Sequence, residues 1–336
     1  MIRDDKPEPY PMSASPVSPA VSLPPLVVRG TTRLLGLLGD PVGHSLSPAM
    51  HNAALSTIGY DAVYLALPVK PENLEAAIDG LRAVNFLGAN VTLPHKATVA
   101  ALFRARGYEL SPLARALGVV NTIVHREDGT LYGDTTDAAG FIAAFEDAHG
   151  SFDGRAVAIL GNGGSARTIA TGLPMMRAVT RVTLVARNLA KAEALAGEVR
   201  AALREPANRA AAPGITISAL TVDGYAAVAA EHDVVVNTTP VGMHPHVDAT
   251  PLPARLLEPA QIVYDIVYNP LETRLLREAR ARGCAVVGGL GMLVHQGKVA
   301  FELWMRAAGR TDGDVAPAIF HEGIRRQQVS QSGGNA

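Results

Sequence analysis

A short apolar segment runs directly into a glycine-rich loop and then into helical sequence. Residues 156–160 read Ala-Val-Ala-Ile-Leu, which is typical of a buried parallel strand. Gly161 and Gly163 follow at once, and Ala166 takes the third position of the G-x-G-x-x-G/A pattern. These positions allow a tight turn, close approach of the backbone to a pyrophosphate and close packing of the helix, whose first N–H groups favour phosphate. The segment predicts a nucleotide-binding α/β unit, with a purely structural turn as the alternative.

Strand-like and helix-like segments alternate along most of the chain. Apolar runs predict strands at 34–39, 63–67, 86–92, 156–160, 182–186, 233–237 and 262–265. Helices are expected at 72–81, at 294–308, and from Pro48 onward with Ser47 as the N-cap. Alternation of this kind implies parallel crossover connections and an α/β fold. A chain of 336 residues is long enough for two such domains.

The residues after the predicted strand at 182–186 indicate which dinucleotide the loop would take. An NAD site usually carries Asp or Glu near this point, where the carboxylate binds the ribose 2′-hydroxyl. This chain carries no acid there and instead places Arg187 and Lys191 one helical turn apart. Arg187 can stack on adenine and pair with a 2′-phosphate, and Lys191 adds a second positive charge. The pattern predicts a preference for NADP(H); the alternative is two solvated charges at a helix start.

The composition bears on the partners and the compartment to be expected. The formal net charge is −1, so no overall positive field would attract nucleic acid or an anionic membrane surface. No apolar run approaches the roughly 20 residues that span a bilayer, and the N-terminus lacks the apolar region of a secretory signal. The single cysteine, Cys284, fits a reducing compartment, and the histidines are too scattered to predict a metal site. We expect a cytoplasmic protein without a metal, a nucleic-acid partner or a membrane partner.

Both ends of the chain are expected to lack a packed structure. Residues 1–30 contain seven prolines, which disfavour both helix and sheet, so this segment is predicted to be a disordered Pro-rich tail. Residues 323–336 end in a polar, glycine-containing stretch and are predicted to be a flexible tail.

Small polar side chains gather where the predicted strands of the first half end. Ser45 and Ser47 place two hydroxyls at a helix entry, where hydroxyl and N–H groups can hold a carboxylate. Lys96 follows a strand and a proline, while Asn121 and Asp137 add an amide and a carboxylate farther along. Taken singly, such a Lys is usually a solvated charge and such an Asp is usually a helix cap. The residues alone therefore leave their chemistry open.

Seven segments of the chain resemble the shikimate dehydrogenase family, and they occur in the order that the family shows. They read GDPVGHSLSPAMHN (39–52), NVTLPHK (90–96), GVVNTIV (118–124), GDTTDAAGF (133–141), LGNGGSA (160–166), VVVNTTPVGM (234–243) and GLGMLVHQGKVAFELW (289–304). Because seven separate segments agree both in sequence and in order, the resemblance is specific.

The resemblance implies an NADP-dependent oxidoreductase that reversibly reduces 3-dehydroshikimate to shikimate, a step towards chorismate and the aromatic amino acids. It implies Lys96 as the principal acid/base and Asp137 as its partner, since reduction of a ketone needs a proton donor at the oxygen. The implied substrate-binding residues are Ser45, Ser47, Thr92, Asn121, Tyr268 and Gln296. The implied cofactor-binding residues are Gly161, Asn162, Gly163, Gly164, Ser165, Ala166, Arg187, Asn188, Lys191, Thr239, Gly289 and Met292.

The resemblance also implies a division into two α/β domains. Residues 31–136 together with 289–322 would form the substrate-binding and catalytic domain, and residues 137–288 a Rossmann-type NADP-binding domain. The expected partner is the small-molecule substrate, and the chain would be a monomer or a homodimer.

Some positions depart from the family's usual pattern. Thr135 stands where the family usually carries Asn, and Asn162 and Ser165 alter the usual glycine loop. The departures concern the subfamily, and two alternatives stay open. One is a quinate/shikimate or aminoshikimate dehydrogenase of the same family. The other is a non-catalytic ligand sensor, in which Lys96 and Asp137 would be expected to be lost.

Overall fold

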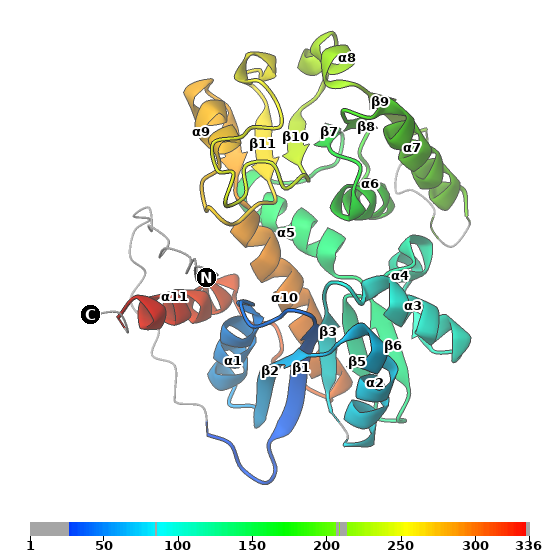
Figure 1. The fold of residues 1–336 in the computed structure, drawn as a ribbon, viewed down its shortest axis with the longest axis vertical. Coiled ribbons are helices and arrows are strands. Elements are labelled where there is room, and N and C mark those ends of the chain that lie inside the picture. The colour runs from blue at the N-terminus through cyan, green and yellow to red at the C-terminus, as the bar shows by residue number, and fades with distance from the viewer. Residues whose placement is uncertain (1–26, 85, 206–207, 209–213, 334–336) are drawn as a thin grey trace, which may run out of the picture. The chain divides into compact units, whose positions relative to one another are not determined.

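The chain divides into two compact units in a computed structural model that describes residues 27–84, 86–205, 208 and 214–333. Unit 1 consists of Met1–His95, Val124–Gly129 and Phe301–Ala336, and unit 2 of Lys96–Ile123 and Thr130–Ala300, each as far as it is described. Figure 1 labels the helices and strands. In the part of the chain that the structure describes, no helix has the length and apolar character needed to cross a membrane.

Unit 1 is built on parallel strands. β1 (Arg33–Gly39) pairs with β2 (Ala62–Pro68) on one side and with β3 (Gly88–Val91) on the other, so that Leu37 lies opposite both Ala66 and Asn90. β5 (Thr122–His125) lies next to β3 and gives its last two residues to this unit. The helices are α1 (Ser47–Thr57), η1 (Pro71–Asn73), α2 (Leu74–Ala83), the end of α10 (Gly289–Ala307) and α11 (Pro317–Gly333).

Aromatic rings form the core of unit 1. The ring of His51 on α1 stacks on Tyr64 of β2 with centroids 4.4 Å apart, and Trp304 and Phe320 lie 5.1 and 6.0 Å from it. Burial lowers the pKa of His51 to about 3, so this ring is neutral in the folded protein. Phe320 and Ile324 bury one side of α11, which is why the helix continues to Gly333 through most of the segment 323–336 that composition marked as a tail.

Unit 2 begins with a small set of strands and helices. β6 (Leu131–Asp134) pairs in parallel with β4 (Glu109–Leu110) and lies next to β5, which gives its first two residues to this unit. The accompanying helices are α3 (Lys96–Ala105), α4 (Pro112–Leu117) and α5 (Asp137–His149). Three polar segments predicted to carry function, at 96, at 118–122 and at 133–137, fall together in this part of the chain.

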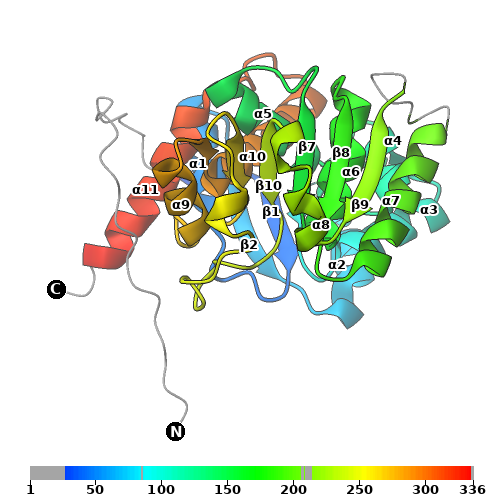
Figure 2. The same cartoon turned by 90° about the horizontal axis from the view of Figure 1, so that it is seen from above.

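A six-stranded parallel sheet makes up the rest of unit 2. Its strands are β7 (Ala156–Leu160), β8 (Arg181–Val185), β9 (Thr216–Leu220), β10 (Val234–Asn237), β11 (Ile262–Asp265) and β12 (Ala285–Val287). The order β12-β11-β10-β7-β8-β9 is the 6-5-4-1-2-3 order of a Rossmann sheet, and neighbours pair in parallel. Figure 2 shows β10, β7, β8 and β9 side by side.

Helices cover both faces of this sheet. Val157 and Ile159 belong to one core, together with residues of α5, α6 (Gly164–Met176) and α7 (Leu189–Arg204). Ala158 and Leu160 belong to a second core, together with residues of α8 (Val222–Ala226) and α9 (Arg274–Ala281). The alternation arises because successive side chains of a strand point to opposite faces. Two short turns, η3 (Ala229–Glu231) and η4 (Ala254–Leu256), complete the unit.

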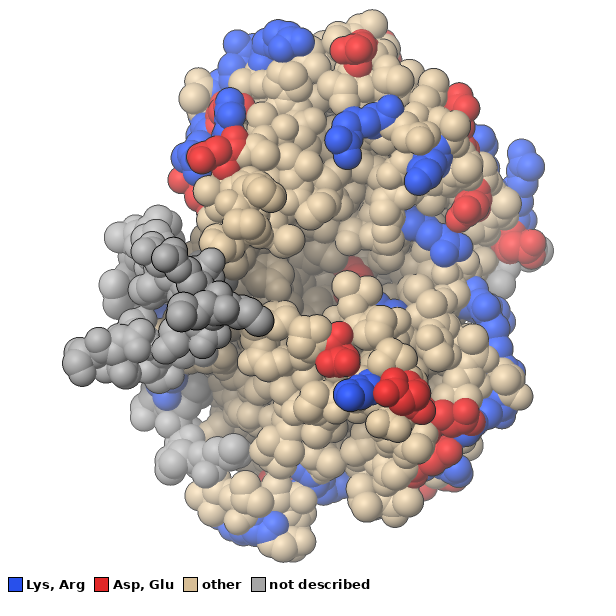
Figure 3. Space-filling model, in the orientation of Figure 1, with Lys and Arg blue, Asp and Glu red and all other residues tan. Residues whose placement is uncertain are grey.

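Charged side chains of both signs share the surface. On the face drawn in Figure 3, Lys and Arg are interspersed with Asp and Glu, in keeping with a net charge of −1. Several form exposed ion pairs, such as Arg274 with Glu278 at 2.6 Å. Pairs of this kind contribute about 0–1 kcal/mol each, so the fold is stabilised mainly by its apolar cores.

Two sequence predictions are changed by the structure. The prediction that Ser47 caps α1 is wrong: α1 begins at Ser47, its N-cap is Leu46, and Ser45 Oγ accepts from the N–H of Ser47 at 3.2 Å. The strand expected at 86–92 is shorter, Gly88–Val91. The two compact units have different bounds from the predicted domains, since 96–123 group with the Rossmann sheet. The compact units are defined by contacts between residues, whereas the predicted domains are defined by function. The predicted domain bounds therefore stay a prediction. Most of the Pro-rich segment, residues 1–26, lies outside the described residues.

Candidate active site

Lys96 and Asp137 form an ion pair at the starts of two helices. Lys96 opens α3 and Asp137 opens α5, and Lys96 Nζ lies 2.7 Å from Asp137 Oδ2. Both side chains are partly open to solvent, with exposed fractions of 28% and 21%. The partial positive charge at a helix N-terminus favours a carboxylate at the position of Asp137. The pair offers a cationic N–H donor that a ligand could reach.

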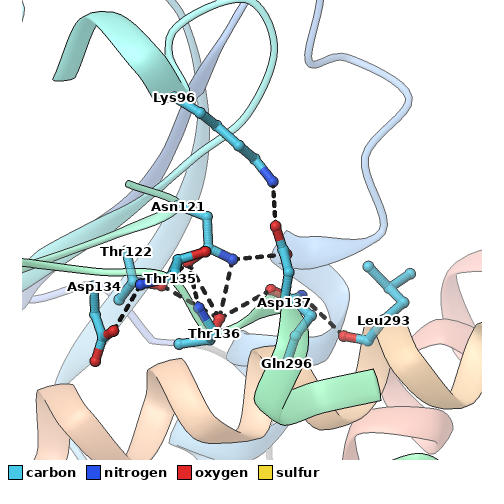
Figure 4. A network of polar contacts seen from close by, with 9 residues as sticks. All are labelled: Lys96, Asn121, Thr122, Asp134, Thr135, Thr136, Asp137, Leu293 and Gln296. Atoms are coloured by element: carbon cyan, nitrogen blue, oxygen red, sulfur yellow. Dashed lines mark hydrogen bonds and ion pairs between the residues drawn. The ribbon is translucent and has the colours of Figure 1, made fainter. Parts of the chain in front are cut away.

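Asn121 fixes the orientation of Asp137. Asn121 Nδ2 donates to Asp137 Oδ1 at 2.8 Å, so the two carboxylate oxygens have different partners (Figure 4). Asn121 Oδ1 accepts from the N–H of Thr136 at 2.8 Å and from the hydroxyl of Thr122 at 2.9 Å. These donors require the amide oxygen on the Thr136 side and therefore the amide nitrogen on the Asp137 side. Three predicted site residues, Lys96, Asn121 and Asp137, thus meet in one network.

Gln296 lies at the edge of this network, on α10. Its Nε2 donates to the carbonyl of Leu293 at 2.9 Å, and its Oε1 lies 3.5 Å from Thr136 Oγ1 (Figure 4). Gly140 of α5 faces it: a Cβ at position 140 would lie 2.5 Å from Cβ and 2.6 Å from Cα of Gln296. Glycine at this position therefore permits the close approach of α5 and α10. Gly140 was not among the predicted site residues, although a glycine inside a helical segment signals such packing.

The other predicted substrate-binding residues are divided between the two units. Ser45, Ser47 and Thr92 belong to unit 1, where Ser47 is buried and Ser45 is partly exposed. Tyr268 belongs to unit 2, follows β11, and is 38% exposed. Within the described residues, no three His, Cys, Asp or Glu side chains are grouped so that they could hold a metal ion.

The glycine loop lies where the strand order of the Rossmann sheet reverses. β7 and β10 are neighbours, but the strands that follow them lie on opposite sides, and sheets of this kind bind ligands at the carboxyl ends of such a pair. Gly161 follows β7 with φ +117°, and a Cβ there would lie 2.8 Å from Thr238 Oγ1, just after β10. Side chains at Gly163 or Gly164 would meet open space. The loop therefore leaves room for a phosphate beside the first N–H groups of α6.

The remaining residues of the glycine loop follow the same pattern. Ser165 is exposed and Asn162 is partly exposed, whereas Ala166 is fully buried in the core of the sheet. A small residue at position 166 lets α6 pack closely on β7, as the pattern requires.

Two basic side chains follow β8. Arg187 and Lys191 are exposed, and in the portion of the chain that is described no carboxylate pairs with either of them. Asn188 is the N-cap of α7, and its Oδ1 accepts from the N–H of Lys191 at 3.0 Å. The cap fixes the start of α7 and leaves both cations available to an anionic ligand.

The predicted cofactor residues on the later loops are held by close contacts. Thr239, after β10, donates from both its N–H and its hydroxyl to Asn237 Oδ1, at 2.9 and 2.7 Å. Gly289 opens α10 against the loop after β11, where a Cβ would lie 2.7 Å from the carbonyl carbon of Val267. Met292 packs, partly buried, against the core of the Rossmann sheet.

A second buried polar network was not anticipated from the sequence. Asp265 ends β11 with no exposed surface, and burial raises the pKa of its carboxyl to about 6. Asn237, at the end of β10, donates to Asp265 Oδ1 at 2.9 Å. The available signal was that both strands end in a polar residue after an apolar run, which places the two side chains at the same edge of a parallel sheet.

Comparison with known proteins decides the family. Residues 37–123 match the model of the shikimate dehydrogenase substrate binding domain. The chain is 46% identical over 285 residues to the shikimate dehydrogenase (NADP(+)) of Symbiobacterium thermophilum, covering 84% of this chain and 92% of that protein. The chain belongs to the shikimate dehydrogenase family. The resemblance inferred from the seven segments is therefore confirmed.

Solved structures agree with this assignment. A shikimate dehydrogenase crystallised in complex with NADP+ has a TM-score of 0.76 and 35% sequence identity, and the match covers 90% of this chain and 97% of that one. A quinate dehydrogenase of Corynebacterium glutamicum in complex with NAD has a TM-score of 0.75 and 30% identity, over 88% of this chain and 99% of that one. The predicted fold class, α/β with two domains of which one is Rossmann-type, is confirmed.

Proposed function

We propose that this protein is an NADP-dependent oxidoreductase that reversibly reduces 3-dehydroshikimate to shikimate. The balanced reaction is 3-dehydroshikimate + NADPH + H⁺ ⇌ shikimate + NADP⁺, in the shikimate pathway of aromatic amino acid biosynthesis. The observation that carries the proposal is the pair of Lys96 Nζ and Asp137 Oδ2 at 2.7 Å, oriented by Asn121, in a chain 46% identical to an NADP-dependent shikimate dehydrogenase.

The residues present fit NADP(H). Gly161 has a φ that side chains disfavour, and Gly163 and Gly164 leave open space beside the start of α6, as a pyrophosphate requires. The exposed cations Arg187 and Lys191 suit a 2′-phosphate, and we assign Thr239, Gly289 and Met292 to the rest of the cofactor site. When bound, NADPH supplies the hydride that reduces the carbonyl carbon.

The chain's own residues supply the proton and the orientation. Lys96 Nζ donates a proton to the carbonyl oxygen during reduction and accepts it from the hydroxyl during oxidation. Asp137 Oδ2 holds the ammonium group in place, and its negative charge offsets the positive charge of Lys96. We assign Ser45, Ser47 and Thr92 to the substrate carboxylate side, and Asn121, Tyr268 and Gln296 to the remaining polar groups of the ring.

The test is turnover by the purified protein, followed by the absorbance of NADPH. Shikimate and quinate are each paired with NADP⁺ and NAD⁺. The variant Lys96→Ala should lower kcat by about 10²–10⁴-fold, because it removes the general acid/base. The matched control is Lys70→Ala, which removes an exposed lysine of unit 1 and should leave kcat unchanged. Near-normal turnover by Lys96→Ala would refute the assigned role.

Each outcome of the substrate comparison has a definite reading. Turnover highest with shikimate and NADP⁺ supports the proposal. Turnover highest with quinate or with NAD⁺ would assign the chain to the quinate branch, to which one structural neighbour belongs. Binding without turnover in any pair would favour the ligand sensor. A cytoplasmic location, a monomeric or homodimeric state and the lack of nucleic-acid and membrane partners stay predictions from the sequence.

A further inference from the structure

Asp265 is a buried carboxylate whose hydrogen-bond donors come from three different segments of unit 2. Its Oδ1 accepts from Asn237 Nδ2 at 2.9 Å and from the N–H of Val267 at 3.0 Å, and its Oδ2 accepts from the hydroxyl of Thr273 at 2.7 Å. Asp265, Asn237 and Thr273 have no exposed surface. The three donors lie at the end of β10, in the loop after β11 and at the N-cap of α9.

Through Asn237 the network reaches the loop that carries Thr239. Asn237 Oδ1 accepts from the N–H and the hydroxyl of Thr239, at 2.9 and 2.7 Å, and Asn237 Nδ2 also approaches the carbonyl of Val241 at 3.3 Å. Thr238, at the start of this loop, is held by the carbonyl of Leu160, which accepts from its N–H at 3.0 Å and its hydroxyl at 2.6 Å. The amide of Asn237 holds the next residue, Thr239. Because Asp265 accepts from the same Nδ2, it fixes which way that amide faces.

Through Val267 the network reaches the loop that carries Tyr268. The N–H of Val267 is held by Asp265 Oδ1, and the N–H of Ile266 donates to the carbonyl of Asn237 at 3.1 Å. On the other side, Gly289 admits the same loop so closely that a Cβ would overlap Ile266 and Val267. The backbone just before Tyr268 is therefore held by Asp265 on one side and by Gly289 on the other.

A buried carboxylate is an expensive way to stabilise a fold. Burial removes its charge from water and raises its pKa, and hydrogen bonds from three neutral donors offset only part of that cost. An apolar side chain of similar size would often serve stability as well or better, but it could not accept three hydrogen bonds from converging segments. The hydrogen bonds of Asp265 are therefore better explained by the positioning of the three segments than by stabilisation of the fold.

We propose that Asp265, acting through Asn237 and Val267, is a positioning residue that holds Thr239 and Tyr268 in one fixed relation. The proposal rests on the function proposed above, because it takes Thr239 as part of the cofactor site and Tyr268 as part of the substrate site. Asp265 itself contacts neither ligand in this assignment.

Three variants separate positioning from simple stability. Asp265→Leu keeps the branch at Cγ but removes every acceptor. Asp265→Asn keeps Oδ1 for Asn237 and Val267, and its new N–H₂ group can donate to the Thr273 hydroxyl. The matched control is Thr183→Val in the same sheet, where the buried Thr183 hydroxyl lies 2.8 Å from His232 Nε2 and is remote in sequence from both loops. The control costs a buried hydrogen bond without touching Thr239 or Tyr268.

Two measurements are made on the full-length proteins. The first is the dissociation constant for NADP⁺ together with kcat/KM for shikimate. Asp265→Leu should weaken NADP⁺ binding about tenfold or more and lower kcat/KM about 10²-fold, as expected for displacement of a binding group by about 1 Å. Asp265→Asn should keep the dissociation constant for NADP⁺ and kcat/KM within about threefold of the unsubstituted protein, a difference below about 1 kcal/mol. Thr183→Val should lower the thermal midpoint but leave both values unchanged.

The second measurement is amide hydrogen exchange without any ligand. Exchange in the segments 238–243 and 266–270 should rise at least about tenfold in Asp265→Leu and not in Thr183→Val, because local opening costs less free energy once the acceptor is lost. This result does not depend on turnover, so failure of the shikimate assay with the unsubstituted protein would refute the proposed function alone. Unchanged exchange in both segments, or functional losses equal to those of Thr183→Val, would overturn the positioning role.

A further variant, Asn237→Ala, covers the case in which Asp265→Leu does not fold. Asn237→Ala removes the acceptor of Thr239 but leaves Asp265 with Val267 and Thr273. It should raise exchange in 238–243 only, and weaken NADP⁺ binding more than shikimate binding. Equal changes in both loops, or no change in either, would contradict the separate routes through Asn237 and Val267.

Discussion

Replacing Gly140 by alanine tests whether the spacing of α5 and α10 sets the geometry of Lys96 and Asp137, the proposed catalytic pair. Asp137 and Gly140 are three residues apart on α5 and so lie on the same side of the helix. Gly140 faces Gln296 on α10, and a Cβ there would lie 2.5 Å from Cβ and 2.6 Å from Cα of Gln296. Carbon atoms in contact prefer about 3.5–4.0 Å, so the two helices have to separate locally by about 1 Å.

The magnitude follows from two opposing terms. Overpacking of this kind costs about 1–3 kcal/mol, whereas replacing glycine by alanine inside a helix stabilises it by about 1 kcal/mol. Gly140→Ala should therefore change the free energy of unfolding by between about 0 and −2 kcal/mol. Gly197→Ala is the matched control: it lies inside α7 of the same unit, and a Cβ there would meet only the end of the Arg200 side chain, at 4.0 Å. The control should gain about 1 kcal/mol.

The effect on activity should be larger than the effect on stability. A displacement of about 1 Å between catalytic and substrate-positioning groups can lower the rate about 10²-fold. We expect kcat/KM for shikimate with NADP⁺ to fall by this order in Gly140→Ala and to stay unchanged in Gly197→Ala. Initial-rate kinetics and urea unfolding of both variants provide the assay. The expectation would be refuted if Gly140→Ala kept the kcat/KM of the unsubstituted protein and gained as much stability as Gly197→Ala. The close approach of α5 and α10 would then not constrain the residue at position 140.

Two further predictions concern charged groups. Arg187→Ala should raise KM for NADP⁺ about 10–100-fold, the value of a lost charge-assisted hydrogen bond, while changing KM for NAD⁺ little; an equal rise for both cofactors would show that Arg187 does not recognise the 2′-phosphate. Burial raises the pKa of Asp265 from 3.8 to about 6, so the folded state binds a proton between these values that the unfolded state has released. The contribution of Asp265 to the free energy of unfolding should thus be most favourable below pH 4 and should fall by about 3 kcal/mol as the pH rises through 6. Urea unfolding from pH 4 to 8 should show this fall in the unsubstituted protein and not in Asp265→Asn. Parallel pH profiles of the two proteins would contradict that assignment.

The local pattern of the chain predicted most strands of the fold and the glycine loop. The run at 156–160 is apolar because both faces of β7 are covered, and the glycine that ends it is required by a φ of +117°. Both causes are local, so both leave a mark in the sequence. The start of α1 was misassigned because serine is a favoured capping residue, whereas the backbone makes Ser47 the first helical residue and Leu46 the N-cap.

What could not be predicted are relations between distant segments. A glycine at position 140 inside a helical segment signals close packing, but the sequence does not say that α10 is the element that approaches it. Asn237 and Asp265 are 28 positions apart and reveal their pairing only once β10 and β11 are known to be neighbours. The proposed catalytic residues, Lys96 and Asp137, were identified through the family resemblance, since the two lie 41 positions apart and neither is unusual alone.

Two carboxylates of unit 2, Asp137 and Asp265, show how burial relates to the task that a side chain can perform. Asp137 is partly exposed and faces a lysine, and it uses one oxygen for Asn121 and the other for Lys96. Its ionised form is compensated by a cation, while the ammonium group keeps donors free for a substrate oxygen. Asp265 is fully buried, receives only neutral donors, and uses both oxygens to hold backbone and side-chain groups of three segments. A carboxylate in the environment of Asp265 could not pair with Lys96. A carboxylate in the environment of Asp137 could not accept hydrogen bonds from the three segments around Asp265. The position of each carboxylate relative to solvent, and not its presence alone, therefore decides which of the two tasks it can perform.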